Sequence, residues 1–308
     1  MRIAVMGAGG VGGYFGARLG HAGHDVAFIA RGAHLAAMRE RGLSVKSALG
    51  DVHLPKPTVT DDPAPLGWFD VVLFAVKLWD TESAAAAIKP LLAAGGVVVP
   101  FQNGVESIER IGAVLGREPV MGGAAYIAAT IAEPGVIAHT GTMARLQFGA
   151  VLPAQRNLAL QLHEACRAAG IDAEIAEDIL KTLWIKFGFL AALSGMTAAT
   201  RQPIGVIRAD PDLRATFEAA IREVWELARA RGIALPDDFV ARQMRFGDGL
   251  PAEMRASMLN DLEAGHRLEA PWLSGAVARM AREAGGAAPV NATLYAAVKP
   301  YCMGRERP

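Results

Sequence analysis

The N-terminal residues have the types and spacing of a turn that binds phosphates. A short apolar run, Ile3 to Met6, leads into the pattern Gly7-x-Gly9-x-x-Gly12. Glycines at this spacing turn the chain sharply, let backbone N–H groups approach a pyrophosphate, and allow the next helix to pack on the strand. The chain holds 34 glycines, so the pattern alone also fits a purely structural turn. A helical run and a second apolar run complete a strand–helix–strand unit of about 30 residues, which favours a dinucleotide site. The cofactor-binding residues expected in this turn are Gly7, Gly9, Gly10 and Gly12.

The residue that ends the second apolar run bears on which dinucleotide is bound. NAD sites carry Asp or Glu there to accept hydrogen bonds from the ribose hydroxyls, whereas this chain has Arg31. A guanidinium group suits a 2′-phosphate. The alternative is an ordinary solvated arginine at a strand end. The sequence therefore favours NADP as the cofactor.

Two polar residues follow the next two buried strands. Lys77 ends an almost continuous apolar run that starts at Phe69, and Asn103 follows another that starts at Gly95. Parallel sheets bind ligands beyond the carboxyl ends of their strands, so both residues are expected near the nicotinamide end of the cofactor. Taken singly, Lys77 is also compatible with a solvated strand end, and Asn103 with a plain Asn-Gly turn.

A lysine interrupts the most apolar helical segment of the chain. The run that begins at Ile179 is apolar nearly all round beyond Thr182, which predicts a central, buried helix. Lys186 within it is unfavourable unless its ammonium group meets a carboxylate or opens into a polar cleft. Buried lysines with lowered pKa values serve as proton donors and acceptors, so Lys186 is the foremost catalytic candidate. The alternative is a lysine whose stem packs and whose head reaches water.

The elements that must position these residues divide into two predicted domains. Residues 1–177 alternate short apolar runs with helical patterns, which is typical of an α/β Rossmann-type dinucleotide-binding domain. Residues 178–308 show helical patterns, which predicts an all-α C-terminal domain, and this domain carries the catalytic candidate Lys186.

Three details of the helical domain follow from local signals. A helix is predicted over residues 251–264 and carries Ser257, with Gly265 as its end. Another is predicted from residue 271 to about 284, and Glu269 just before it would complement the helix N-terminus, which is a structural alternative to a catalytic role. Asn291 is predicted to cap the final helix.

Composition excludes several classes of partner. The 308 residues are 52% hydrophobic, and 31 basic residues balance 31 acidic ones, which gives no electrostatic case for nucleic acid or an acidic membrane surface. Cys166 and Cys302 are in no metal-binding or redox spacing, so we expect inert thiols, no metal site and a reducing, cytoplasmic location. No apolar run reaches the roughly 20 residues of a membrane span. The expected partners are a small molecule and a second copy of the chain.

Together these residues resemble the ketopantoate reductase (2-dehydropantoate 2-reductase) family. The resemblance runs through both domains and rests on motifs that occur in the family's order. They are Gly7-x-Gly9-x-x-Gly12, Arg31, Val76-Lys77, Gln102-Asn103-Gly104, Leu183-Trp184-x-Lys186, Ser257-Met258-Leu259-x-Asp261 and Glu269.

The resemblance implies NADPH-dependent reduction of the 2-oxo group of ketopantoate, in pantothenate biosynthesis, by a dimeric enzyme. It makes Lys186 the general acid that protonates the carbonyl oxygen, while Glu269 orients that lysine and contacts the cofactor. Ser257 would hold the substrate, and Asn103 would touch substrate and cofactor. Lys77 would support the nicotinamide side. Ala128 lies where the family contacts the cofactor through its backbone.

The chain departs from the family at three substrate-binding positions. The family places asparagines one and two helical turns after the lysine, where this chain has Leu190 and Ser194. A third asparagine, in a Pro-Asn-Gly turn, is replaced by Ile204. A pocket with these changes should bind ketopantoate less well unless another group such as Arg201 compensates.

Three functions are therefore expected in order of preference. The first is ketopantoate reduction with Lys186 as general acid. The second keeps the lysine but acts on a different, more apolar 2-oxo acid or ketone. The third is a non-catalytic NADP-binding sensor, against which the joint presence of Lys186, Ser257 and Glu269 argues.

Overall fold

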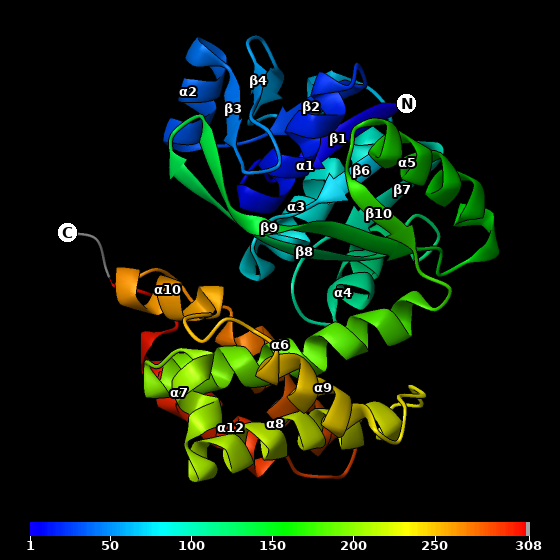
Figure 1. The fold of residues 1–308 in the computed structure, drawn as a ribbon. Coiled ribbons are helices and arrows are strands. Elements are labelled where there is room, and N and C mark those ends of the chain that lie inside the picture. The colour runs from blue at the N-terminus through cyan, green and yellow to red at the C-terminus, as the bar shows by residue number, and fades with distance from the viewer. Residues whose placement is uncertain (306–308) are drawn as a thin grey trace. The chain divides into compact units, whose positions relative to one another are not determined.

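A computed structural model describes residues 1–305 of the chain, and these form two compact units (Figure 1). Unit 1 comprises Met1–Gln102 and Glu106–Ile179. Unit 2 comprises Asn103–Val105 and residues 180–305. The chain therefore leaves unit 1 for three residues after Gln102 and returns to it at Glu106.

A parallel sheet of five strands organises unit 1, in the order β5-β2-β1-β6-β7. Its longer strands are the apolar runs of the sequence, and side chains such as Ile3, Val71 and Val98 are fully buried. All pairings between neighbours in this sheet are parallel, as expected for strands covered on both faces. The strands are β1 (Arg2–Met6), β2 (Asp25–Ile29), β5 (Thr58–Thr60), β6 (Phe69–Phe74) and β7 (Leu92–Pro100). The helices of unit 1 are α1 (Gly10–His21), α2 (Gly32–Arg41), α3 (Thr81–Ile88), α4 (Ser107–Leu115) and α5 (Arg156–Ala168).

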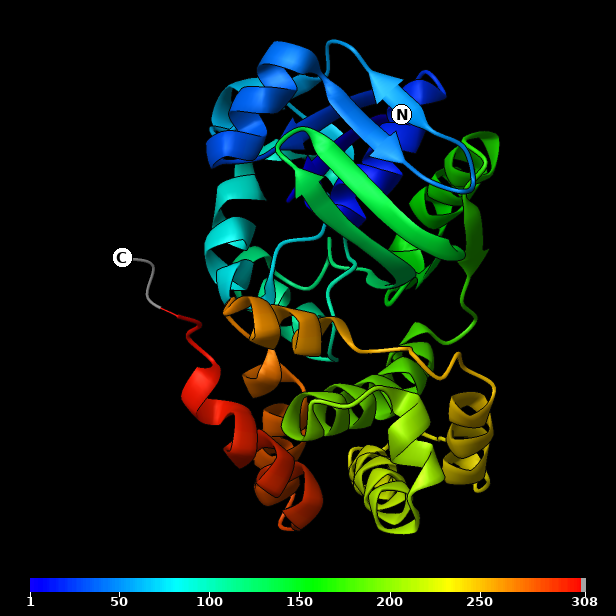
Figure 2. The same ribbon diagram turned by 60° about the vertical axis from the view of Figure 1, so that its left-hand side comes forward.

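A second sheet in unit 1 is mixed and is built around one long hairpin. Strands β8 (Gly122–Glu133) and β9 (Val136–Gly149) pair antiparallel and are the two long green arrows of Figure 2. On its other edge β9 pairs in parallel with β3 (Leu43–Lys46) and β10 (Asp172–Ile175), and β4 (Val52–Leu54) pairs with β3. Short 3-10 turns join the elements at η1 (Ala64–Leu66), η2 (Leu78–Asp80), η3 (Lys89–Leu91) and η4 (Pro153–Gln155).

Unit 2 is all helical and has its own apolar core. Its long helix α6 (Ile179–Thr200) meets the length and composition of a membrane span, yet 67% of its apolar window is buried, as in the core helix of a soluble protein. The remaining elements are α7 (Ile204–Ala209), α8 (Pro211–Ala230), α9 (Phe239–Asp248), α10 (Ser257–Ala264), η5 (Ala270–Trp272), α11 (Ser274–Glu283), α12 (Pro289–Val298) and η6 (Lys299–Tyr301). The α/β and all-α fold classes predicted from the sequence are confirmed.

Two predicted helices of unit 2 are shorter than their sequence patterns indicate. The helix predicted over 251–264 begins only at Ser257, because carbonyls before it pair with another segment. Met254 O accepts from Ile204 N at 2.9 Å, and Ala252 O accepts from Gly205 N at 2.8 Å. The helix predicted from residue 271 is divided by Leu273, whose φ of −109° and ψ of −105° are not helical.

The prediction that Asn291 caps the last helix is wrong. Asn291 is the third residue of α12, after the N-cap Ala288. The capping acceptor is instead the buried Glu223 carboxylate of α8, which accepts from Val290 N at 2.7 Å and from Asn291 N at 2.9 Å. A carboxylate at a helix N-terminus satisfies donors that have no partner within the helix. Glu223 thereby connects α8 to α12.

Candidate active site

The glycines of the first turn have three different surroundings. Gly7 has a φ of +97°, a conformation that favours glycine, and a Cβ there would lie 2.9 Å from the backbone of Ala75. A Cβ on Gly12 would lie 2.2 Å from Gly7 O, so this glycine permits α1 to pack against β1. A Cβ on Gly9 would meet no heavy atom of residues 1–305 within 4 Å beyond its chain neighbours. The turn therefore offers open backbone where a pyrophosphate would approach.

The start of α1 supplies donors for an anion. Gly9 is its N-cap and provides no side-chain hydrogen bond to the first turn. The amides of a first helical turn have no intrahelical acceptor, which suits them to phosphate oxygens. A Cβ on Gly10 would lie 2.0 Å from Ala129 O, so glycine at position 10 lets β8 pass close by. Ala128, the predicted backbone contact, is exposed at an irregularity in the β8–β9 pairing between Ile127 and Ala129. These surroundings fit a bound dinucleotide.

Arg31 lies at the carboxyl end of β2 as the N-cap residue of α2, and its side chain is 80% exposed. Its Nη2 atom is 2.6 Å from Asp80 Oδ2, in the turn that follows β6. A guanidinium in this position is accessible to a ribose phosphate. The Asp80 carboxylate would compete with that phosphate for Arg31. No sequence motif predicts this ion pair.

Lys77 lies in an extended conformation between β6 and η2. Its Nζ atom is 5.8 Å from the centre of the Trp79 ring. The segment is held by the buried Gln102, whose Nε2 donates to Val76 O at 3.0 Å and to Thr81 Oγ1 at 2.9 Å. Gln102 therefore fixes the loop that carries Lys77.

The predicted catalytic residues Lys186 and Glu269 form one hydrogen-bonded group with Asn103, which is predicted to touch substrate and cofactor. Lys186 Nζ donates to Asn103 Oδ1 at 3.4 Å, and Asn103 Nδ2 donates to Glu269 Oε2 at 3.2 Å. Glu269 is 8% exposed and makes no side-chain capping bond to η5, so its carboxylate does not serve as a helix cap. The structure thus joins three residues that are far apart in the sequence.

The surroundings of Lys186 change the pKa of its amine. Desolvation lowers the pKa of Lys186 from 10.5 to about 8, and the negative charge of Glu269 opposes that change. The lowered pKa is caused by loss of hydration, because burial disfavours the charged form of the amine. An amine with such a pKa can both donate and accept a proton near neutral pH.

The remaining predicted substrate residues differ in accessibility. Leu190 is half-buried on α6, one turn after Lys186, whereas Ser194 is 1% exposed and Ile204 is fully buried in the core of unit 2. Of the three departures from the family pattern, Leu190 alone retains substantial surface. Ser257 is exposed at the first position of α10. Arg201 is exposed just after α6 with a φ of +56°, and its guanidinium lies 5.8 Å from the Tyr301 ring centre.

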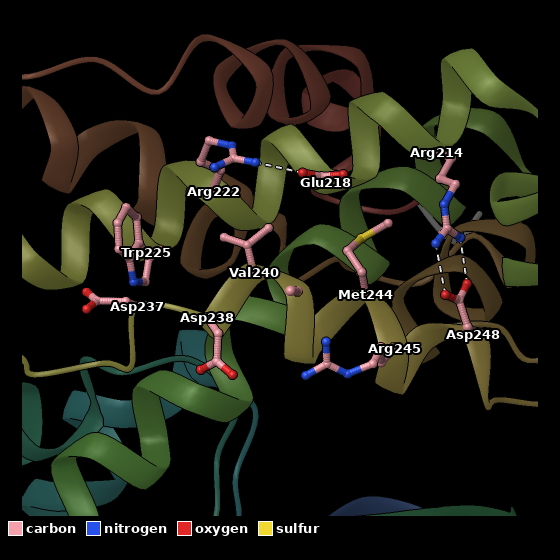
Figure 3. Close-up of a pocket in the computed structure, with 11 residues that line it drawn as sticks. Arg214, Glu218, Arg222, Trp225, Asp237, Asp238, Val240, Met244, Arg245 and Asp248 are labelled. Carbon is pink, nitrogen blue, oxygen red and sulfur yellow. Dashed lines mark hydrogen bonds and ion pairs between the residues drawn. The ribbon is translucent and has the colours of Figure 1, made fainter.

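A separate cleft of about 410 Å³ lies between α8 and α9 of unit 2 (Figure 3). Arginines and carboxylates line it, and they form pairs such as Arg214 with Asp248 and Arg222 with Glu218. The cleft contains none of the predicted site residues.

Among residues 1–305, neither the cysteine thiols nor the metal-binding side chains form a second candidate site. Both cysteines are buried, and burial raises the pKa of Cys166 to about 12 and raises that of Cys302, which agrees with inert thiols. Within residues 1–305, no group of three or more His, Cys, Asp or Glu side chains is arranged to hold a metal ion.

Comparison with known proteins gives matches along nearly the whole chain. The family model described as "Ketopantoate reductase PanE/ApbA" matches residues 3–153, and "Ketopantoate reductase PanE/ApbA C terminal" matches residues 178–301. The uncharacterized oxidoreductase YkpB of Bacillus subtilis is 31% identical over 98% of this chain and 99% of its own. The 2-dehydropantoate 2-reductase of Archaeoglobus fulgidus is 33% identical over 97% of both chains.

A solved structure shows the same fold. The crystal structure of a PanE/ApbA family ketopantoate reductase from Ralstonia eutropha matches with a TM-score of 0.89 and 32% identity, over 98% of both chains. Both family models and full-length relatives above 30% identity agree with the resemblance drawn from the motifs. The chain belongs to the ketopantoate reductase family of oxidoreductases, which act on CH–OH and C=O groups.

Proposed function

We propose that this protein reduces a 2-oxo acid with NADPH, and that Lys186 is the general acid. The observation that carries the proposal is the Lys186–Asn103–Glu269 group, in which a lysine of lowered pKa is linked through an amide to a buried carboxylate. Family membership supports the reaction type.

Unit 1 would hold the cofactor. The open backbone at Gly9, with Gly7, Gly10 and Gly12 shaping the turn, would accept the pyrophosphate. The exposed Arg31 would bind the 2′-phosphate. Lys77 would support the nicotinamide side, and Ala128 would contact the cofactor through its backbone. When bound, NADPH supplies the hydride.

Unit 2 would supply the proton and the substrate contacts. The Lys186 ammonium would donate to the carbonyl oxygen as negative charge develops there, a charge that exists only in the transition state. Glu269 favours the protonated lysine through its charge, and Asn103 holds the lysine by its side-chain oxygen. Ser257 on α10 would hydrogen-bond the substrate. With Lys186 deprotonated, the same residue would accept a proton in the reverse oxidation.

Ketopantoate is the substrate that family membership favours, and its reduction would serve pantothenate biosynthesis. A second candidate is a more apolar 2-oxo acid or ketone, favoured by the half-buried Leu190, where the family's amide would hydrogen-bond ketopantoate. Ser194 and Ile204 weigh less in this choice because both are buried in unit 2. The joint presence of Lys186, Ser257 and Glu269 argues against a non-catalytic NADP sensor. A homodimer in the cytoplasm fits such a biosynthetic reductase.

The test is NADPH oxidation by the purified protein with ketopantoate and, in parallel, with bulkier and more apolar 2-oxo acids. Preference for ketopantoate supports the pantothenate role. Preference for an apolar acid assigns the same chemistry to another substrate. Turnover of none of them, with NADPH still bound, would favour the sensor.

A further inference from the structure

His34 of α2 connects two separate parts of unit 1. Its Nε2 atom lies 2.9 Å from Ala8 O in the glycine turn, and its Nδ1 atom accepts from Gly135 N at 3.0 Å in the turn between β8 and β9. The histidine is half-buried. No motif in the sequence singles it out.

These two bonds determine the tautomer of the imidazole. Because Nδ1 accepts a hydrogen bond from an amide, it carries no proton, and Nε2 must therefore be the N–H that donates to Ala8 O. Burial lowers the pKa of His34, while its bond to Ala8 raises it, and the net lowering favours this neutral form. Both ring nitrogens are satisfied in one orientation.

The turn at Gly135, which donates a hydrogen bond to His34, is fixed by further contacts. Gly135 O accepts from Ser44 N at 2.9 Å, and Arg41 Nη2 donates to Pro134 O at 3.2 Å. A Cβ on Gly135 would lie 3.2 Å from Ala37 Cβ, so this turn packs directly on α2. His34 therefore anchors the glycine turn to a fixed support.

The bond to Ala8 O also sets the direction of the next amide. Peptide bonds between the described residues are all trans, and in a trans peptide the C=O and N–H groups point in opposite directions. When His34 holds the Ala8 carbonyl, the Gly9 N–H is turned away from His34. Gly9 is the residue whose added Cβ would meet open space, where a phosphate would approach.

We propose that His34 is a positioning residue that orients the Gly9 amide toward the pyrophosphate of the bound dinucleotide. The inference rests on the proposed function, because it requires a dinucleotide at the glycine turn. His34 does not touch the reacting atoms in this proposal. It should therefore affect cofactor affinity and leave the chemical step unchanged.

The test compares His34→Ala with His34→Gln, whose neutral amide offers one donor and one acceptor in a plane. NADPH binding is measured by the change in its fluorescence, and kcat and both KM values are measured at saturating co-substrate. We expect His34→Ala to weaken NADPH binding about tenfold, the effect of one hydrogen bond to a charged group, with kcat and the 2-oxo acid KM unchanged. His34→Gln should recover most of the affinity.

The matched control is His53→Ala, which removes a histidine of unit 1 that bonds Ser44 Oγ at 2.9 Å. Equal NADPH affinity in wild type and His34→Ala would overturn the inference and leave the proposed function standing. A parallel fall of kcat and both affinities, not recovered by His34→Gln, would show a merely structural role and also overturn it. A wild-type protein that binds neither NADPH nor NADH would refute the proposed function itself.

Discussion

The protonation of Lys186 should control the pH dependence of the reaction in both directions. With Lys186 as general acid, reduction requires the protonated amine, so kcat/KM for the 2-oxo acid should be constant at low pH and fall tenfold per pH unit above a pKa of about 8. Oxidation of the alcohol requires the neutral amine, so its rate should rise through the same pH. As the pH rises through this pKa, the rate of reduction should therefore fall while the rate of oxidation rises.

The magnitude follows from the surroundings of the lysine. The pKa falls from 10.5 to about 8, which at about 1.36 kcal/mol per pH unit means that the site disfavours the ammonium form by about 3 kcal/mol. Glu269 opposes the effect of burial, so Glu269→Gln should move the limb of the reduction profile to a lower pH. Removing the general acid with Lys186→Ala should lower kcat by about 10²- to 10⁴-fold.

The assay is the initial rate of NADPH oxidation from about pH 6 to 10, with the reverse reaction measured in the same buffers. Lys186→Arg keeps a positive charge but releases no proton in this range, so it should lose the limb near pH 8 together with most of the rate. Lys181→Ala, on the same helix, is the control and should behave as wild type. A Lys186→Ala protein that keeps the wild-type rate, or the same limb, would refute the assignment.

Three further changes test separate parts of the molecule. Asp80→Asn frees Arg31 from a surface ion pair worth about 1 kcal/mol, so NADPH titrations should show about fivefold tighter binding and NADH titrations no change. Leu190→Asn should raise kcat/KM for ketopantoate about tenfold relative to an apolar 2-oxo acid, and an unchanged ratio would mean that this position does not contact the substrate. Glu223→Ala leaves buried amides of α12 without an acceptor and should lower the free energy of unfolding in urea by about 3 kcal/mol, whereas Glu226→Ala, exposed on the same helix, should have almost no effect.

Local patterns were sufficient for most of the fold. Apolar runs of strand length predicted β1, β2, β6 and β7, because each is covered on both faces and tolerates few polar residues. The pairing of residues 252–254 with the start of α7 could not be predicted, since it joins carbonyls and amides about 50 residues apart. The same holds for Glu223, which caps a helix 66 residues later in the chain.

The residues of the candidate site were predicted singly from local sequence, and only the family resemblance linked Glu269 to Lys186. Lys186 is conspicuous because a charge in an all-apolar helix needs an explanation. Its contact with Asn103 spans 83 residues, and the contact of Asn103 with Glu269 spans 166, so neither follows from local sequence. Asp80 and His34 gave no signal at all, because an aspartate in a turn and a histidine on a helix are ordinary in themselves.

The Gln102-Asn103-Gly104 segment is a tight turn and also carries a candidate site residue, so the two interpretations drawn from the sequence do not exclude each other. Gln102 belongs to unit 1 and holds the loop of Lys77, while Asn103 belongs to unit 2 and bonds Lys186 and Glu269. Gly104 has a φ of +82°, and a Cβ there would lie 3.2 Å from Trp272 O, so the turn needs its glycine. Because Asn103 precedes Gly104 directly and its side chain bonds Lys186, a substitution at Gly104 should perturb Lys186 through Asn103. The segment is therefore both a turn that needs its glycine and the source of a side chain bonded to the candidate catalytic group.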